Sequence, residues 1–203
     1  MAFLPIHLAV EDDLSEAALR RILHDRDADY DVRAVYKKNG FGYLKKNIHA
    51  FNRAARHVPF LLLTDLDNNP CPTAMIQEWL RAPQHPNFLF RVAIHEVEAW
   101  MLADLDALCG FLGARRKPRL PAPETIEDAK EAVLRIAMRS QRRPIKESMA
   151  RRARDGRITQ GPIYNATMAK FVRTRWRPWL AARNAPSLSR LEAALDRLED
   201  SWR

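Results

Sequence analysis

Apolar runs alternate with amphipathic segments over residues 1–112 of this 203-residue chain. Three short apolar stretches have the length and composition of β-strands, at residues 5–10, 58–65 and 87–94. A fourth strand is predicted at residues 30–36, where apolar and polar residues alternate. The segments that follow them carry apolar residues at helical spacing, at residues 13–24, 43–56, 72–81 and 95–112. This alternation predicts an α/β fold, a three-layer domain with a mostly parallel central sheet.

The pattern changes in the remaining part of the chain. Residues 114–123, with the sequence A-R-R-K-P-R-L-P-A-P, form a basic connector that is rich in proline. Four further segments then have helical periodicity, at residues 126–140, 144–154, 165–176 and 187–202. We therefore divide the chain into an α/β domain at residues 1–113 and a basic, all-helical extension at residues 114–203.

Composition narrows the class of protein. Hydrophobic residues make up 47% of the chain, which is enough for a core and argues against general disorder. No apolar run approaches the roughly 18 residues of a transmembrane helix, and the amino terminus lacks the basic leader of a signal peptide. Cys71 and Cys109 form no paired motif, which argues against a zinc site or a disulfide framework. We expect a cytoplasmic protein with reduced thiols and no membrane partner.

Carboxylates follow three of the predicted strands. The apolar run at residues 58–65 leads directly into Asp65 and Asp67, while Glu11 ends the first strand and Glu98 lies just after the fourth. The carboxyl ends of parallel strands meet at one edge of a sheet, so these side chains are expected to converge. Because converging carboxylates repel one another, the pattern predicts a Mg²⁺ or Mn²⁺ ion among them.

Other residues near these strand ends have simpler structural explanations. Asp12, Asp13 and Glu16 fall at the start of a predicted helix, where acids cap the helix or favour its dipole. His95 is expected to be a cap or surface residue rather than a catalytic one, because the sequence shows no partner for it. Trp100 lies among apolar residues and is expected in the core.

Positive charge is concentrated in the second half of the chain. The net charge is +9, with 12 Lys and Arg against 13 Asp and Glu over residues 1–100, and 22 against 12 over residues 101–203. Clustered cations attract nucleic-acid phosphates, although a solvated basic surface is the alternative interpretation. The expected phosphate contacts are Lys37, Lys38, Lys45, Lys46, Arg142, Arg143, Arg151 and Arg152. A later stretch mixes arginine with tryptophan, which suits base stacking or a partner protein, at Arg173, Arg175, Trp176, Arg177 and Trp179.

The order of a strand, Glu11, a helix and a later strand ending in D-L-D at residues 65–67 resembles the Toprim domain. Topoisomerases, bacterial primases, recombination proteins and OLD-type nucleases share this α/β domain. The segment F-R-V-A-I-H-E-V-E-A-W-M-L-A-D at residues 90–104 is similar to small stand-alone Toprim-like proteins found beside AAA-type ATPases in bacterial defence loci. One departure is that Asp12 follows Glu11, where the Toprim glutamate is commonly followed by glycine.

The resemblance implies a metal-dependent nuclease that cleaves DNA in preference to RNA. It further implies the effector subunit of an anti-phage defence system with an AAA-type ATPase as its partner. Glu11 would then be a metal ligand or the general acid/base, Asp65 and Asp67 would bind Mg²⁺ or Mn²⁺, and Glu98 rather than Glu96 would be a further ligand. Two alternatives stay open. Nucleotide-sugar transferases also place an Asp-Xaa-Asp pair after an apolar strand, and a regulatory subunit without catalytic activity would retain the fold and bind an ATPase.

Overall fold

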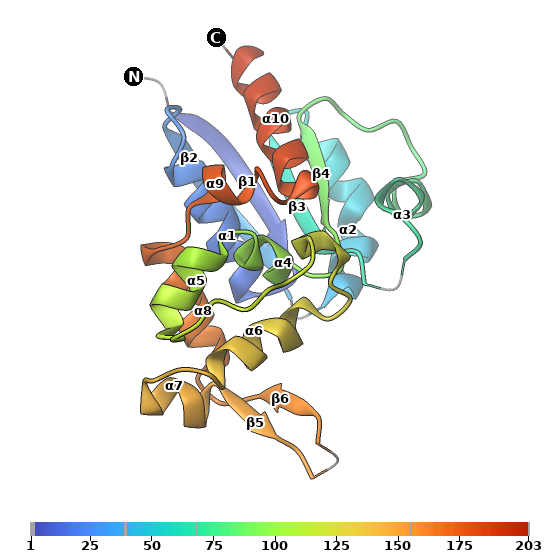
Figure 1. The fold of residues 1–203 in the computed structure, drawn as a ribbon. Coiled ribbons are helices and arrows are strands. Elements are labelled where there is room, and N and C mark those ends of the chain that lie inside the picture. The colour runs from blue at the N-terminus through green and yellow to red at the C-terminus, as the bar shows by residue number, and fades with distance from the viewer. Residues whose placement is uncertain (1–2, 39, 68, 155, 203) are drawn as a thin grey trace.

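The computed structural model describes residues 3–38, 40–67, 69–154 and 156–202. Its central sheet has four strands in the order β2-β1-β3-β4 (Figure 1). The strands are β1 (Leu4–Val10), β2 (Tyr30–Lys37), β3 (Phe60–Asp65) and β4 (Phe88–Ala93). Neighbouring strands are parallel in every pair, so the predicted α/β fold class with a parallel central sheet is confirmed.

The two central strands are buried on both faces. On β3, Leu63 belongs to the core on one side of the sheet and Leu62 to the core on the other. Burial on both sides explains why the strand sequence is a continuous apolar run rather than an alternating one. The register pairs Val10 with Leu63 and Asp65 with Ala93, so β1, β3 and β4 end at the same edge.

Helices cover both faces of the sheet and give the predicted three layers. On one face lie α2 (Phe41–Ala54) and α3 (Pro72–Trp79), which pack into the smaller core. The other face carries α1 (Asp13–His24) together with the helices that follow β4. Figure 1 shows α2 and α3 on the side of the sheet away from α1.

The segment after β4 differs from the single helix predicted at residues 95–112. It contains two helices, α4 (Glu98–Leu102) and α5 (Leu105–Leu112). Asp104 separates them, because its Oδ1 accepts a hydrogen bond from the Ala107 N–H and so caps α5. The same carboxylate pairs with Arg177 at 2.6 Å, a partner far along the chain that local periodicity does not reveal.

The carboxyl-terminal part consists of helices and one small hairpin. Its elements are η1 (Pro123–Thr125), α6 (Ala129–Ala137), α7 (Arg143–Ser148), β5 (Ala150–Arg152), β6 (Ile158–Gln160), α8 (Tyr164–Thr174), α9 (Pro178–Ala181) and α10 (Pro186–Asp200). The prediction of an all-helical extension is therefore wrong in one detail, since β5 and β6 form an antiparallel pair. The helix predicted at residues 144–154 ends at Ser148, where the backbone turns into β5 and Met149 accepts a hydrogen bond from the Gly161 N–H.

The extension and the α/β unit share one continuous core. α8 packs on α1 and α10 packs on β4. Trp100 and Trp176 are fully buried, and the indole N–H of Trp176 donates to the Trp100 carbonyl at 3.2 Å. The prediction that Trp100 is a core residue is confirmed, whereas Trp176 is buried and cannot be a base-stacking surface. No helix in the described ranges has the length and apolar character needed to cross a membrane.

Candidate functional site

Glu11 lies directly after β1 at the carboxyl edge of the sheet. Its Oε1 accepts hydrogen bonds from the Thr64 hydroxyl and, at 3.0 Å, from the Asp65 backbone N–H. Burial raises the pKa of Glu11; these two hydrogen bonds oppose the rise, and the charges of Asp67 and Asp12 add to it. The bonds hold the carboxylate of β1 against the end of β3.

Asp65 is the last residue of β3 and is the most strongly perturbed acid of the site. Its Oδ1 accepts a hydrogen bond of 3.0 Å from the Val97 N–H, which follows β4. Burial raises the pKa of Asp65 well above its usual range, and the neighbouring charges of Glu98 and Glu11 raise it further. The carboxylates predicted from three strand ends therefore do interact at one place.

Asp67 completes the predicted set from an exposed position. Its backbone is left-handed, with φ of 47°, and its N–H donates to the His95 carbonyl at 3.2 Å. Asp67 acts on the site through its charge, which raises the pKa of both Glu11 and Asp65. His95 also has a left-handed φ of 58° and precedes the helix that begins at Glu98, so the prediction that a helix starts at His95 is wrong.

Glu98 is almost fully buried, with 4% of its surface exposed. Its Oε1 accepts a hydrogen bond of 2.9 Å from the Tyr164 hydroxyl and lies 3.6 Å from Lys130 Nζ. Burial raises the pKa of Glu98, while Lys130 opposes that rise. Both partners come from the extension, so this segment helps to build the site.

Glu96 serves mainly to join the extension to the α/β unit. Its Oε2 accepts a hydrogen bond of 2.8 Å from the Lys130 N–H in the first turn of α6. A negative charge there interacts favourably with the helix dipole. Lys130 Nζ also lies 3.8 Å from Glu96 Oε1. Burial would lower the pKa of Lys130, but the surrounding carboxylates outweigh it and the net shift is upward. Lys130 is thus a counter-charge within the acidic site, which sequence reasoning missed.

The acids just after β1 have the structural roles expected of them. Asp12 caps α1, since its Oδ1 accepts a hydrogen bond of 2.8 Å from the Ser15 N–H. Asp13 and Glu16 in the first turn both pair with Lys37. This confirms that these three carboxylates belong to the helix start.

The donor atoms at this edge suit a hard divalent cation. Among the described residues, no group of three or more His, Cys, Asp or Glu side chains is arranged to hold a metal ion by itself. Mg²⁺, however, commonly takes only one or two protein carboxylates and completes its shell with water and substrate phosphates. Glu11 and Asp65 fit that requirement, because Glu11 contacts the backbone of Asp65 and both acids have a pKa raised by burial and, to a smaller extent, by neighbouring carboxylates. A bound cation would favour the ionised form of both acids.

The sequence profile of DUF4276, described as a domain of unknown function, matches residues 11–156. The chain belongs to the DUF4276 family. No curated protein and no solved structure matches the chain significantly. The DUF4276 segment begins at Glu11 and contains Asp65, Glu98 and Lys130, whereas Tyr164 lies beyond it. All carboxylates of the candidate site thus belong to the family segment, and one of their hydrogen-bond donors does not.

The basic residues expected to contact phosphates fall into two regions of this DUF4276 protein. Around α2, Lys37 pairs with acids of α1, Lys45 pairs with Glu78 at 2.6 Å, and Lys38 Nζ lies 5.3 Å from the centre of the Tyr43 ring. Lys46 is exposed. Lys37 and Lys45 are therefore partly neutralised within the protein.

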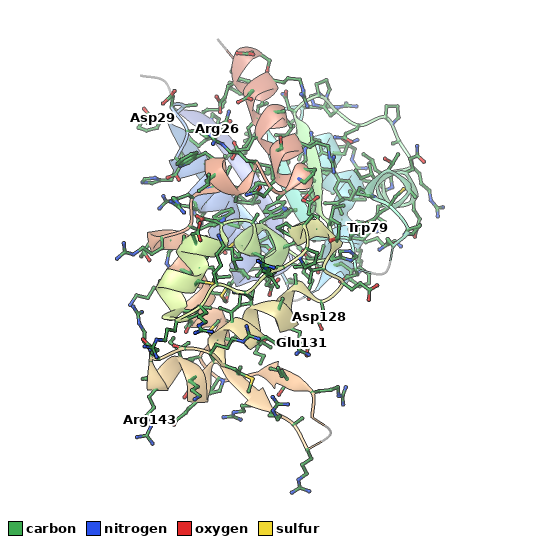
Figure 2. All side chains as sticks on the ribbon, viewed as in Figure 1. Arg26, Asp29, Trp79, Asp128, Glu131 and Arg143 are labelled. Atoms are coloured by element: carbon green, nitrogen blue, oxygen red, sulfur yellow. The ribbon has the colours of Figure 1, made fainter. Side chains whose placement is uncertain are left out.

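The second basic region lies around α7 and β5. Arg142 Nη1 donates to the Phe111 carbonyl at 2.8 Å, and Arg143 pairs with Glu147 at 3.0 Å. Arg151 and Arg152 are exposed on β5. Figure 2 shows Arg143 at the end of the molecule opposite to Arg26. Phosphate contact by these residues stays a prediction.

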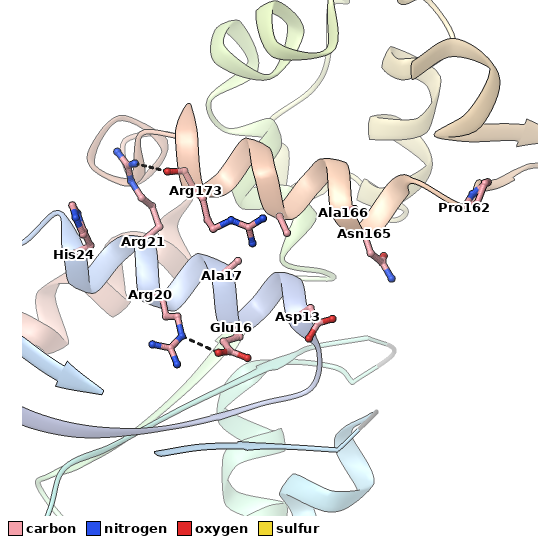
Figure 3. A pocket seen from close by; sticks show the side chains of 11 residues that line it. Asp13, Glu16, Ala17, Arg20, Arg21, His24, Pro162, Asn165, Ala166 and Arg173 are labelled. Carbon is pink, nitrogen blue, oxygen red and sulfur yellow. Dashed lines mark hydrogen bonds and ion pairs between the residues drawn. The ribbon is translucent and has the colours of Figure 1, made fainter. Parts of the chain in front are cut away.

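A groove of about 790 Å³ runs between α1 and α8 (Figure 3). Asp13 and Glu16 line the end near the amino terminus of α1, and Arg21 and Arg173 line the other part. Its charges are mixed and partly paired within the protein, since Arg20 pairs with Glu16 at 2.8 Å. The groove begins beside the acidic edge, but its lining does not select a ligand of one charge.

Proposed function

We propose that this DUF4276 protein is a metal-dependent nuclease that hydrolyses nucleic-acid phosphodiesters at the carboxyl edge of its sheet. The observation that carries the proposal is the contact of Glu11 with the end of β3, beside an Asp65 whose pKa is strongly raised by burial and by neighbouring acids. Perturbed acids of this kind cluster at functional sites more often than elsewhere. The resemblance to the Toprim domain supports the same chemistry.

In this proposal Glu11 and Asp65 hold Mg²⁺ or Mn²⁺, with Asp67 at the exposed rim. The ion would neutralise charge that develops on the phosphodiester oxygens during hydrolysis. If Glu11 does not hold the ion, its carboxylate would instead accept the proton of the attacking water. Tyr164 and Lys130 both contact Oε1 of Glu98 and orient its carboxylate. The other carboxylate oxygen would be the one to contact a metal ion.

Lys130 would balance charge in the same site. Its ammonium group feels Glu98, Glu96, Asp12 and Asp65 together. Such a cation keeps a carboxylate cluster from accumulating excess negative charge before the substrate phosphate arrives. We therefore expect Lys130 to support substrate binding by offsetting the repulsion between these acids and the phosphodiester.

A nucleic-acid substrate is supported by the net charge of +10 in the second half of the chain, from 22 basic and 12 acidic residues. The expectation of DNA rather than RNA rests on the Toprim resemblance. The exposed Arg151 and Arg152 on β5 would contact the backbone beyond the cleavage point. An AAA-type ATPase partner and a role in anti-phage defence are part of the proposal and rest on the Toprim resemblance.

A cleavage assay tests the proposal. Wild-type protein, Asp65→Asn and Asp27→Asn would be incubated with DNA and RNA in the presence of Mg²⁺ or Mn²⁺. Asp27 is an exposed residue of the loop before β2, so its variant is a matched loss of one carboxylate at the opposite edge of the sheet. We expect Asp65→Asn to lose activity about 100-fold or more and Asp27→Asn to keep it. Equal cleavage by all three proteins would exclude the proposed role of Asp65.

A further inference from the structure

Arg91 is a partly buried cation on β4, an edge strand of the sheet. Its strand neighbours Leu89 and Ala93 belong to the core on the α10 side, so the alternation of side chains directs Arg91 to that side as well. Its Nε is buried and has no hydrogen-bond partner in the described structure. A buried polar atom without a partner is unusual, and an ion or water absent from the coordinates is one explanation for it.

Two further arginines lie beside Arg91 on α10, which packs against β4. With 3.6 residues per turn, Arg190 and Arg197 fall within about 20° of each other around the helix axis. Both are exposed. The charges of both arginines act on Arg91, which places them on the side of α10 that faces β4 at the edge of the sheet.

Three of the four carboxylates of α10 lie on the other side of its buried stripe. Glu192, Asp196 and Glu199 all pair with Arg26, which follows α1. Around the axis, these three acids lie at least about 100° from Arg190 and Arg197, whereas Asp200 at the end of the helix lies about 60° from Arg197. The three acids that pair with Arg26 therefore do not neutralise the arginine side.

Repulsion within the arginine group is consistent with this geometry. Burial lowers the pKa of Arg91, and the charges of Arg197 and Arg190 lower it further. Gathering three cations beside a buried segment is unfavourable unless an anion offsets their charge.

We propose that Arg91, Arg190 and Arg197 form a binding site for a phosphate group at the open edge of the sheet. A phosphate presents enough oxygens to accept hydrogen bonds from three guanidinium groups at once, whereas a carboxylate has only two oxygens. The planar donor fork of arginine matches phosphate geometry better than the ammonium of lysine does. The site is separate from the acidic cluster and does not depend on the proposed nuclease activity.

Calorimetric titration of inorganic phosphate into the full-length protein tests the site, in chloride buffer at matched ionic strength. Wild type should bind phosphate saturably. The double variant Arg190→Ala/Arg197→Ala, which changes only exposed positions, should bind about tenfold more weakly or worse. Arg91→Lys keeps the charge but loses the fork and should also bind more weakly. Arg135→Ala/Arg139→Ala removes the same charge from exposed positions at α6 and should bind like wild type.

Absence of saturable binding to wild type, or equal affinity in the two double variants, would overturn the proposal. Asp65→Asn should bind phosphate normally, which separates this site from any failure of the nuclease hypothesis. A single-stranded oligonucleotide, added with a chelator to prevent cleavage, identifies the source of the phosphate. Competition with inorganic phosphate would assign the site to a nucleic-acid backbone, and its absence would assign it to a small phosphorylated molecule.

Discussion

Asp65 combines a stabilising hydrogen bond from the Val97 N–H with unfavourable burial among other carboxylates. Because the pKa of Asp65 is raised in the folded state, the folded protein retains this proton at pH values where the unfolded chain has released it. The free energy of unfolding therefore falls as pH rises from the ordinary aspartate range through the raised one. We predict that Asp65→Asn, in the absence of divalent ions, is more stable than wild type at neutral pH by on the order of 1 kcal/mol.

Urea denaturation across a pH series measures this difference. It should shrink to nothing in acid below the ordinary pKa of an aspartate, where both states of the wild type carry the proton. Asp27→Asn, at an exposed position, should show no comparable gain. A variant of Asp65 that is less stable than wild type at neutral pH would contradict the account of its charge.

The residues of the candidate site divide into those that sequence reveals and those that it does not. Glu11 and Asp65 were predictable, because strand ends in a parallel sheet must meet at one edge. Lys130 and Tyr164 were not, because they reach Glu98 from α6 and α8, and no local pattern reports which helix of the extension packs over the sheet. Nothing in the sequence around Lys130 indicates that its side chain lies beside Glu98.

At the scale of elements, the end of β6 depends on a glycine. A Cβ atom at Gly161 would lie 2.1 Å from the Ser148 carbonyl oxygen, so the backbone itself would have to move. We predict that Gly161→Ala destabilises the protein by about 1–3 kcal/mol, measured by urea denaturation. Gly110→Ala is the matched control, because Gly110 lies in α5 with nothing within 4 Å of a Cβ and should tolerate alanine or gain stability. Equal effects of the two substitutions would refute the close approach.

The docking of α10 depends on one arginine. The Arg26 side chain is 11% exposed and pairs with three carboxylates of α10, at 2.6 Å in the case of Glu192. We predict that Arg26→Met destabilises the protein by about 3 kcal/mol, because it leaves clustered acids without their cation. Arg20→Ala removes an exposed pair and should cost under about 1 kcal/mol. Urea denaturation of both variants measures the two losses of stability. Similar losses would contradict the role of Arg26 in docking α10.

Elements with strong local patterns were predictable from the sequence. The strands of the sheet are marked by apolar runs, and α1, α2 and α10 by helical spacing. The hairpin of β5 and β6 was not predictable, because strands of three residues are too short to show a period of two. The Asp104 carboxylate that caps α5 also pairs with Arg177, which is 73 residues away along the chain, and no local pattern shows this pairing.

At the scale of the whole molecule, the extension completes the core of the α/β unit. Phe171, Trp176 and Leu188 from the extension are fully buried in the same cluster as Leu8 of β1. We predict that a chain ending at residue 156, where the DUF4276 match ends, does not fold cooperatively. Thermal melting followed by circular dichroism tests this. A cooperative transition of the shortened chain would show that residues 1–156 suffice.

The acidic edge of the sheet is the basis of the nuclease function proposed for this DUF4276 protein. The most direct test of it is a Mn²⁺ titration followed by electron paramagnetic resonance, with wild type, Asp65→Asn and the exposed control Asp27→Asn. We predict saturable Mn²⁺ binding by wild type and by Asp27→Asn, and binding weakened about tenfold or more by Asp65→Asn. Equal binding by wild type and Asp65→Asn, or no saturable binding by wild type, would contradict a cation site at the carboxyl edge of the sheet.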